Sequence, residues 1–268
     1  MQMLSRYNIV VVGSTSKIAQ LLAPYLCDKF SQLIVINHRQ ISSEEISFFP
    51  NAQNFLIDFS KPNLAYEKML TEILDKLVGP TILLNFTGVL GDLSDINQID
   101  IEKTLSVVNK NLVPFLILTK FAMLLENNSA YVGFSGAGVG GQNLDLSSIG
   151  YAASKGSIGV LIEAIDLKLR ESQKFAFLIA PGAFPSKMQK AILDNPRQRT
   201  EKTKAYEQAS DTFAHEPSVA KLVSLMDYLL ENLELAGGKI FSVKWDDPNN
   251  ISNDKDFGRI RRVDKSVM

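Results

Sequence analysis

The sequence contains only one cysteine, Cys27, so no disulfide bond can form within the chain. Its two histidines, His38 and His215, are far apart and lack companion ligands at the usual spacing, so no metal site is expected. Charge of one sign is not in excess, because 28 Lys and Arg residues stand against 29 Asp and Glu residues, for a net charge of −1. This balance argues against binding to nucleic acid or to an anionic membrane surface.

Long hydrophobic runs are also missing. No uninterrupted apolar stretch reaches the roughly 18–20 residues that span a bilayer, and the first residues lead into an apolar segment without a signal-peptide pattern. Together with the single cysteine, these features predict a cytoplasmic protein that does not bind membranes. The 268 residues, 46% hydrophobic and 21% charged, match one large soluble α/β domain in size and composition.

Short, apolar, β-branched segments alternate along the chain with longer segments that have helical periodicity. Such alternation predicts an α/β fold of the Rossmann type, with a doubly wound parallel sheet of seven strands between two helical layers. We expect a single domain over residues 1–245, a substrate lid at about 183–217 and a C-terminal tail at 246–268. The expected strands are residues 8–12, 33–36, 54–57, 81–84, 130–134, 175–179 and 239–243, and the expected helices are 17–30, 62–77, 101–125, 151–170 and 218–232.

Distinctive residues follow five of the expected strands. Gly13, Asp58, Asn85, Ser135 and Pro181 each stand at or just beyond a strand end. In a doubly wound parallel sheet these ends share one edge, and ligands bind there. We therefore expect the functional site at this edge.

The turn after the first strand is suited to a pyrophosphate. Glycine at position 13 allows close approach of the backbone, and the start of the following helix favours an anion. The hydroxyls and backbone amides of the next three residues could contribute, and so could the first helical residues. The alternative is a serine-capped helix start without a ligand. The candidate residues are Gly13, Ser14, Thr15, Ser16, Lys17 and Ile18.

The end of the second strand bears on the choice of dinucleotide. A carboxylate there would bind the adenosine ribose and repel a 2′-phosphate. Asn37, His38 and Arg39 occupy this place, so a cation is present and a carboxylate is not. This pattern favours NADP(H), to which Lys17 could add, and it leaves NAD(H) possible.

A tyrosine and a lysine, Tyr151 and Lys155, lie four residues apart after the fifth strand. On a helix they share one face, and a phenol beside a fixed ammonium is a proton donor or acceptor with a lowered pKa. The spacing alone is not specific, because Tyr25 and Lys29 share it. The position of the second pair, beside the other strand-end residues, favours it as a catalytic site.

Taken in order, these motifs resemble the short-chain dehydrogenase/reductase family over residues 9–243. The resemblance implies a nicotinamide-dependent oxidoreductase in which Tyr151 is the general acid or base and Lys155 binds the nicotinamide ribose. It also implies a proton-relay role for Asn111, and a homodimer or homotetramer that pairs through the helices after the fourth and fifth strands. The further residues that it places at the cofactor are Asp58 and Phe59, Asn85, Phe86, Thr87 and Gly88, and Pro181 and Gly182.

The sequence departs from the family pattern in two places. Lys17 and Ala19 replace two glycines of the first turn. Ser135 stands sixteen residues before Tyr151, whereas the family usually places its carbonyl-binding serine about a dozen residues before the tyrosine. Ser147 or Ser148 could replace it, and a strand-end hydroxyl bound to backbone is the alternative for Ser135 itself.

We interpret the chain as an NAD(P)-dependent oxidoreductase of a ketone or secondary alcohol, with NADP(H) preferred. The charged segment 189–211 favours a small polar substrate over the long acyl chain of an acyl-thioester ketoreductase. A family member that has lost catalysis and serves as a dinucleotide sensor is the second alternative. The tail, with Arg261 and Arg262, resembles that of reductases of surface-polysaccharide and nucleotide-sugar pathways, and these two arginines could bind a phosphorylated substrate. A basic tail exposed to solvent explains them equally well.

Overall fold

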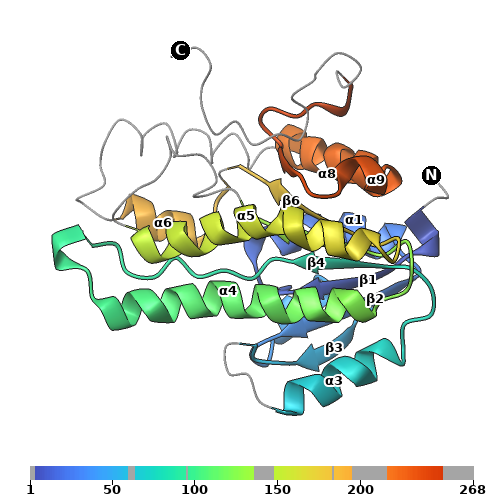
Figure 1. Cartoon of the computed structure of the whole chain (residues 1–268), viewed down its shortest axis with the longest axis horizontal. Helices are drawn as coiled ribbons and strands as arrows, with labels where there is room; N and C mark the ends of the chain where they lie inside the picture. Colours follow the sequence, from blue (N-terminus) through green and yellow to red (C-terminus); the bar gives the residue numbers. More distant parts are fainter. Residues whose placement is uncertain are drawn as a thin grey trace.

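The computed structural model describes residues 4–59, 64–94, 96–135, 148–182, 184–194 and 216–249. One parallel sheet of seven strands forms the centre of the molecule, in the order β3-β2-β1-β4-β5-β6-β7 (Figure 1). This order reverses direction at β1, as expected for a doubly wound sheet, and confirms the predicted Rossmann-type fold. The strands are β1 (Asn8–Val12), β2 (Gln32–Asn37), β3 (Gln53–Leu56), β4 (Thr81–Asn85), β5 (Ala130–Phe134), β6 (Phe175–Ala180) and β7 (Ile240–Ser242).

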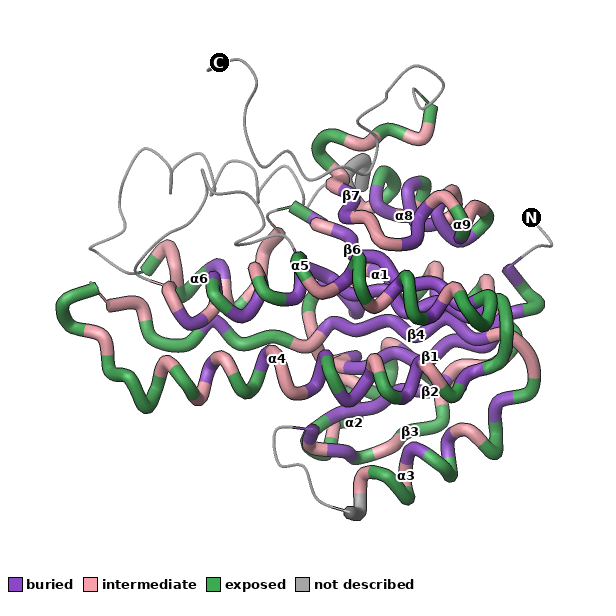
Figure 2. The backbone as a smooth tube through the Cα atoms, viewed as in Figure 1, coloured by how far each residue is buried: buried purple, intermediate pink, exposed green. Residues whose placement is uncertain are grey.

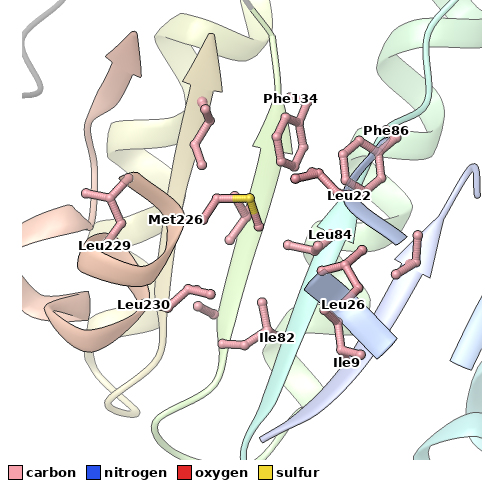
Figure 3. Close-up of a cluster of buried hydrophobic side chains, with 14 of the residues drawn as sticks. Ile9, Leu22, Leu26, Ile82, Leu84, Phe86, Phe134, Met226, Leu229 and Leu230 are labelled. Atoms are coloured by element: carbon pink, nitrogen blue, oxygen red, sulfur yellow. The ribbon is translucent and has the colours of Figure 1, made fainter. Parts of the chain in front are cut away.

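Helices cover both faces of the sheet and complete three layers (Figure 1). Successive side chains of a strand point to opposite faces, so Ile9 and Val11 of β1 join one core cluster, and Val10 and Val12 join the other. The first cluster includes residues of α1 (Lys17–Lys29) and α8 (Glu216–Glu231), and Figure 3 shows Leu22, Leu26 and Met226 against the strands. The second cluster is formed against α3 (Leu64–Leu74), α4 (Ile101–Leu124) and α5 (Ile149–Arg170).

Several short helices were not predicted. They are η1 (Leu4–Arg6), α2 (Ser43–Ser47), η2 (Ile96–Gln98) and α9 (Leu233–Ala236); a further short helix, α6 (Lys187–Leu193), lies in the predicted lid, where short helices were expected. Their few residues give too little periodicity to distinguish them from loops. Of the predicted helix at 62–77, residues 62 and 63 lie outside the described residues, and α3 ends at Leu74. Of the predicted lid, only 184–194 and 216–217 are among the described residues, and of the tail only 246–249.

Helix α4 is the one described helix that is long and apolar enough to cross a membrane by length and composition. Its position in the fold accounts for this composition. Phe115, Leu118 and Phe121 are almost fully buried against the sheet, and α4 lies beside α5 along its length (Figure 2). We therefore interpret α4 as a core helix.

The far end of α5 is anchored by a buried carboxylate. Asp166 accepts the N–H of Ala176 in β6 at 2.9 Å through Oδ1, and the Nε–H of Arg170 through Oδ2. Arg170 donates in turn to the carbonyl oxygens of Glu234 and Gly237, at 2.7 and 3.3 Å. A Cβ on Gly237 would lie 2.4 Å from Arg170 Nη2 and from Asp166 Oδ1, so a larger residue there would displace this charge pair. Helix α5, β6 and the segment before β7 are locked together around this charge pair.

Candidate active site

The carboxyl ends of the central strands come level with one another. Val12 of β1 is in register with Ile36 of β2 on one side and with Asn85 of β4 on the other, and Asn85 is in register with Gly133 of β5. The segments that leave these strands therefore meet at one edge of the sheet, as predicted. The residues expected to act on a ligand are brought together there from β1, β4, α4, β5 and α5.

The turn after β1 depends on Gly13. This residue has a φ of 81°, in the left-handed region that favours glycine. A Cβ at this position would lie 3.4 Å from the carbonyl carbon of Phe86 and 3.5 Å from the nitrogen of Thr87, on the chain that leaves β4. The backbones after β1 and β4 thus approach each other closely, directly before the start of α1. A pyrophosphate fits such a cradle, because it requires free backbone N–H groups near a helix N-terminus.

Two of the three hydroxyls in this turn have internal roles. Ser14 is buried, and its Oγ accepts from Nδ2 of Asn37 at 2.8 Å. Ser16 is the N-cap of α1, and its Oγ accepts the N–H of Ala19 at 3.2 Å. The serine-capped helix start considered from the sequence is therefore present. Ser14, Ser16 and Asn37 offer a ligand mainly backbone groups, whereas Thr15 and Lys17 are accessible.

Beyond β2 and β3 the predicted adenosine contacts are unequally exposed. His38 and Arg39 are exposed, and Arg39 forms an ion pair with Glu45 that sequence analysis missed. Asp58 is half-buried at the end of β3. Phe59 is buried in the second core cluster, so its side chain supports the sheet and only its backbone is near this edge.

The segment after β4 is held in shape by Asn85. Its Nδ2 donates to the buried hydroxyl of Tyr131 at 2.7 Å, and its Oδ1 accepts from both the backbone N–H and the hydroxyl of Thr87, at 3.0 and 2.7 Å. Phe86 stacks on Phe134 with ring centroids 4.2 Å apart and belongs to the first core cluster (Figure 3). These contacts fix the backbone of residues 86–88, which is the part that remains available to a ligand.

Lys155 lies against this segment. It is 4% exposed, and its Nζ donates to the carbonyl oxygen of Thr87 at 3.0 Å. A Cβ on Gly88 would be 3.2 Å from the same Nζ, so glycine at this position leaves room for the ammonium. Burial lowers the pKa of Lys155 from 10.5 to about 8, because the charged form loses its hydration.

Tyr151 lies one turn before Lys155 on α5 and is half-buried, with its ring centroid 6.0 Å from the lysine Nζ. The other pair with this spacing has a similar separation of 5.8 Å, between Lys29 Nζ and the Tyr25 ring. However, the Tyr25 hydroxyl donates to Asp227 at 2.8 Å, and burial and this carboxylate raise its pKa. Tyr25 is therefore a structural residue between α1 and α8.

Asn111 connects α4 to the segment after β4 and to α5. Its Oδ1 accepts the N–H of Val89 at 2.8 Å, and its Nδ2 donates to the Val89 carbonyl oxygen at 3.0 Å. The same Nδ2 donates to Oγ of Ser154 at 2.9 Å, and Ser154 donates to the carbonyl oxygen of Tyr151 at 2.9 Å. Ser154 was missed from the sequence, although its place between Tyr151 and Lys155 on the inner face of α5 was a usable signal. Together Asn111 and Ser154 fix Tyr151 relative to the sheet.

Ser135 follows β5 and is 3% exposed. Its N–H continues the sheet by donating to Ile179 at 3.0 Å, but its Oγ has no hydrogen-bond partner among the residues that the structure describes. A buried hydroxyl without a partner is costly, and a ligand oxygen would satisfy it. Of the two alternatives, Ser148 directly precedes α5, and Ser147 lies outside the described residues.

The turn after β6 completes the edge. Pro181 is buried, and the exposed Gly182 has a φ of 85°, so the backbone here again requires glycine. Within the described parts of the chain, no group of three or more His, Cys, Asp or Glu side chains could hold a metal ion. The donors at this edge are backbone amides, hydroxyls, an amide side chain and a lysine, a set that suits a dinucleotide and a carbonyl or alcohol.

No known protein family and no curated protein matches the sequence. Many solved structures share the fold. One is a short-chain dehydrogenase/reductase from Saccharomyces cerevisiae, with a TM-score of 0.72 and 17% identity over 92% of this chain and 98% of that one. The NADPH-bound carbonyl reductase from chicken fatty liver has a TM-score of 0.68 and 15% identity, over 90% of this chain and 98% of that one. For 4-hydroxyisoleucine dehydrogenase complexed with NADH, the TM-score is 0.65 and the identity 17%, over 88% of this chain and 96% of that one. At these identities the comparison shows a shared fold.

Proposed function

We propose that this chain is a short-chain dehydrogenase/reductase that transfers hydride between a nicotinamide dinucleotide and a ketone or secondary alcohol. The observation that carries the proposal is the place of Lys155. Its buried amine is held by the Thr87 carbonyl, one helical turn from Tyr151, at the edge where the Gly13 turn forms a cradle. The shared fold with solved dehydrogenases and reductases supports it.

The dinucleotide, when bound, supplies or accepts the hydride. In the direction of reduction, the Tyr151 hydroxyl donates its proton to the substrate oxygen, and the ammonium of Lys155 stabilises the phenolate that remains. The Ser135 hydroxyl donates a hydrogen bond to the same substrate oxygen and thereby gains the partner that it lacks among the described residues. Asn111 and Ser154 hold α5 in register with the segment after β4 during these steps.

The choice of dinucleotide belongs to the proposal as well. We propose that NADP(H) is preferred, with Arg39 and Lys17 near the adenosine 2′-phosphate, because both cations are exposed and no carboxylate occupies positions 37–39. The substrate is proposed to be small and polar, and the protein cytoplasmic, on the composition given above. Arg261 and Arg262 lie outside the described residues, and their role stays a prediction.

Titration of the purified protein with NADPH and with NADH tests the proposal. Trp245 is the only tryptophan and lies just beyond β7, so energy transfer from its indole to a reduced nicotinamide provides the signal. We expect both dinucleotides to bind with micromolar dissociation constants, NADPH the more tightly. Failure of both to bind would contradict the proposal. Binding without turnover of any polar ketone or alcohol would favour the sensor alternative.

We further propose that two copies pair through α4 and α5, which lie side by side (Figure 1). The outer face of α5 presents Ala153, Ser157, Val160, Ala164 and Leu167, all exposed and none charged. Helix α4 adds exposed leucines. They are Leu105, Leu116 and Leu124. An apolar face of this extent on two adjacent helices is typical of a subunit interface.

Val160→Asp should convert the expected dimer to a monomer at micromolar concentration, because it would bury two carboxylates close to the centre of the paired surface. Sedimentation velocity measures this change. Val78→Asp is the matched control, since Val78 is 84% exposed, against 63% for Val160, and lies in the loop between α3 and β4, outside the two helices of the proposed interface. A monomeric unmodified chain, or equal effects of the two substitutions, would exclude this interface.

A further inference from the structure

The loop after β2 holds an ion pair that bears on the choice between the two nicotinamide dinucleotides. Arg39 directs two N–H donors at the carboxylate of Glu45, with Nη1–Oε2 and Nη2–Oε1 distances of 3.0 and 2.5 Å. Another donor on Nη1 binds the carbonyl oxygen of Gln40 at 2.8 Å. The cation expected to favour a 2′-phosphate is therefore already engaged, end-on, by an anion of the same chain.

Glu45 is the fixed partner of this pair. Its Oε2 also accepts the backbone N–H of Ser42 at 2.9 Å, and the Ser42 hydroxyl accepts the N–H of Glu45, so the two residues form a capping box at the start of α2. The side chain of Glu45 is 19% exposed, whereas that of Arg39 is 48% exposed. The hydrogen bond from Arg39, followed by that from Ser42, lowers the pKa of Glu45 to about 2, so the carboxylate is charged at neutral pH.

The ion pair changes which hydrogen-bond donors and charges are available to a phosphate beside Arg39. Because Glu45 takes the two terminal nitrogens of Arg39, an incoming oxyanion is left with the edge formed by Nε and Nη2. A phosphate on that edge would be attracted by the guanidinium and repelled by the adjacent carboxylate. A ribose hydroxyl at the same place carries no charge, so its binding would depend little on either group.

We propose that Glu45 is a selectivity residue that weakens the preference for NADP(H) by neutralising Arg39, so that the chain accepts NAD(H) as well. The inference rests on the proposed function and deepens it. Opposite charges in a close surface pair present little net potential to a third charge. The nearby cation Lys17, at the start of α1, then carries most of the attraction for the phosphate.

The test compares Glu45→Gln with Glu44→Gln in the full chain, through dissociation constants for NADPH and NADH measured at low ionic strength. Glutamine also completes a capping box at this position, so α2 is preserved and thermal unfolding checks that it is. Glu44 is the preceding residue on α2, and its substitution makes the same change in net charge. We expect Glu45→Gln to tighten NADPH binding by about three- to tenfold and to change NADH binding by less than about twofold. In Glu44→Gln, the ratio of the NADPH affinity to the NADH affinity should change by less than about twofold.

Arg39 supplies the second arm of the experiment. Arg39→Ala alone should weaken NADPH more than NADH, because Glu45 then faces the phosphate uncompensated, and in combination with Glu45→Gln it should remove the gain. An unchanged or lower preference for NADPH in Glu45→Gln, with NADH still bound, would overturn the role of Glu45 and leave the proposed function intact. If the unmodified chain binds neither dinucleotide, both the inference and the proposed function are overturned.

Discussion

Tyr151→Phe is expected to lower kcat by about 10²–10⁴-fold, the usual contribution of a positioned general acid or base. The substitution removes one oxygen and keeps the ring. The hydrogen bond from Lys155 to the Thr87 carbonyl and the bond from Ser154 to the Tyr151 carbonyl do not involve that oxygen, so the cradle for the dinucleotide should persist. Steady-state kinetics and dinucleotide titration of the same preparation therefore separate proton transfer from binding. Loss of turnover with unchanged affinity is the expected pair of results.

Tyr25→Phe is the matched control, since Tyr25 has the same spacing to a lysine and also lies on a helix. It removes the hydrogen bond to Asp227, so we expect a loss of about 1 kcal/mol in the free energy of unfolding and no loss of kcat. A Tyr151→Phe protein that keeps near-normal kcat would assign proton transfer to another group. A kcat that falls equally in both variants would indicate a general structural effect.

Lys155→Met is expected to abolish activity without destabilising the protein. Removing a preorganised charge beside the reacting groups should lower kcat by at least about 10²-fold. In the protein without dinucleotide, however, burying this ammonium is destabilising. A pKa of about 8 in place of 10.5 lowers the free energy of unfolding by about 3 kcal/mol at neutral pH. Methionine fills the same space without a charge, and the hydrogen bond to Thr87 that is lost offsets part of the gain. Urea unfolding at pH 7 without dinucleotide should therefore show equal or greater stability.

The pH dependence of this effect has a defined sign. Because the folded-state pKa of Lys155 lies below its ordinary value, folding releases a proton between pH 8 and 10.5, and stability from this group increases across that window. Below pH 8 the full cost of the buried charge is present. The stability difference between Lys155→Met and the unmodified chain should therefore shrink as the pH rises from 8 to 10.5. A flat difference for Lys155→Met across this window would disprove the assigned cost.

Much of the fold could be predicted because its signals are local. Val10, Val11 and Ile34 belong to uninterrupted β-branched runs, and they are fully buried in the central strands as such runs predict. The edge strand β3 was also placed to within one residue, although most of it is exposed. The strand ends then indicated the place of the site, because parallel strands bring their carboxyl ends to one edge of the sheet regardless of the length and sequence of the loops.

The side-chain partners within the site could not be predicted in the same way. Asn37 and Ser14 are 23 residues apart, and Asn111 and Ser154 are 43 apart, so their hydrogen bonds depend on how the layers pack and not on local spacing. As a result, the sequence suggested the Ser14 hydroxyl as a phosphate donor, whereas in the structure it is turned inward and bonded to Asn37. The Arg39–Glu45 pair has a different cause, because it forms across a turn and does not have a helical spacing that would predict it.

The hydrogen bonds of the Asp166–Arg170 pair at the far end of α5 join residues that are synthesised at different times. Arg170 is synthesised long before its carbonyl partners at Glu234 and Gly237, which follow 64 and 67 residues later. Until they arrive, the guanidinium can pair only with Asp166, and water can reach its remaining donors because its side chain is 35% exposed. The bonds that join α5 to the segment before β7 can therefore form only after residues 234–237 have been made. A chain that stops before Gly237 would lose β7 and the bond from Arg170 to Gly237, but would keep the contacts of α5 with α4 and β6.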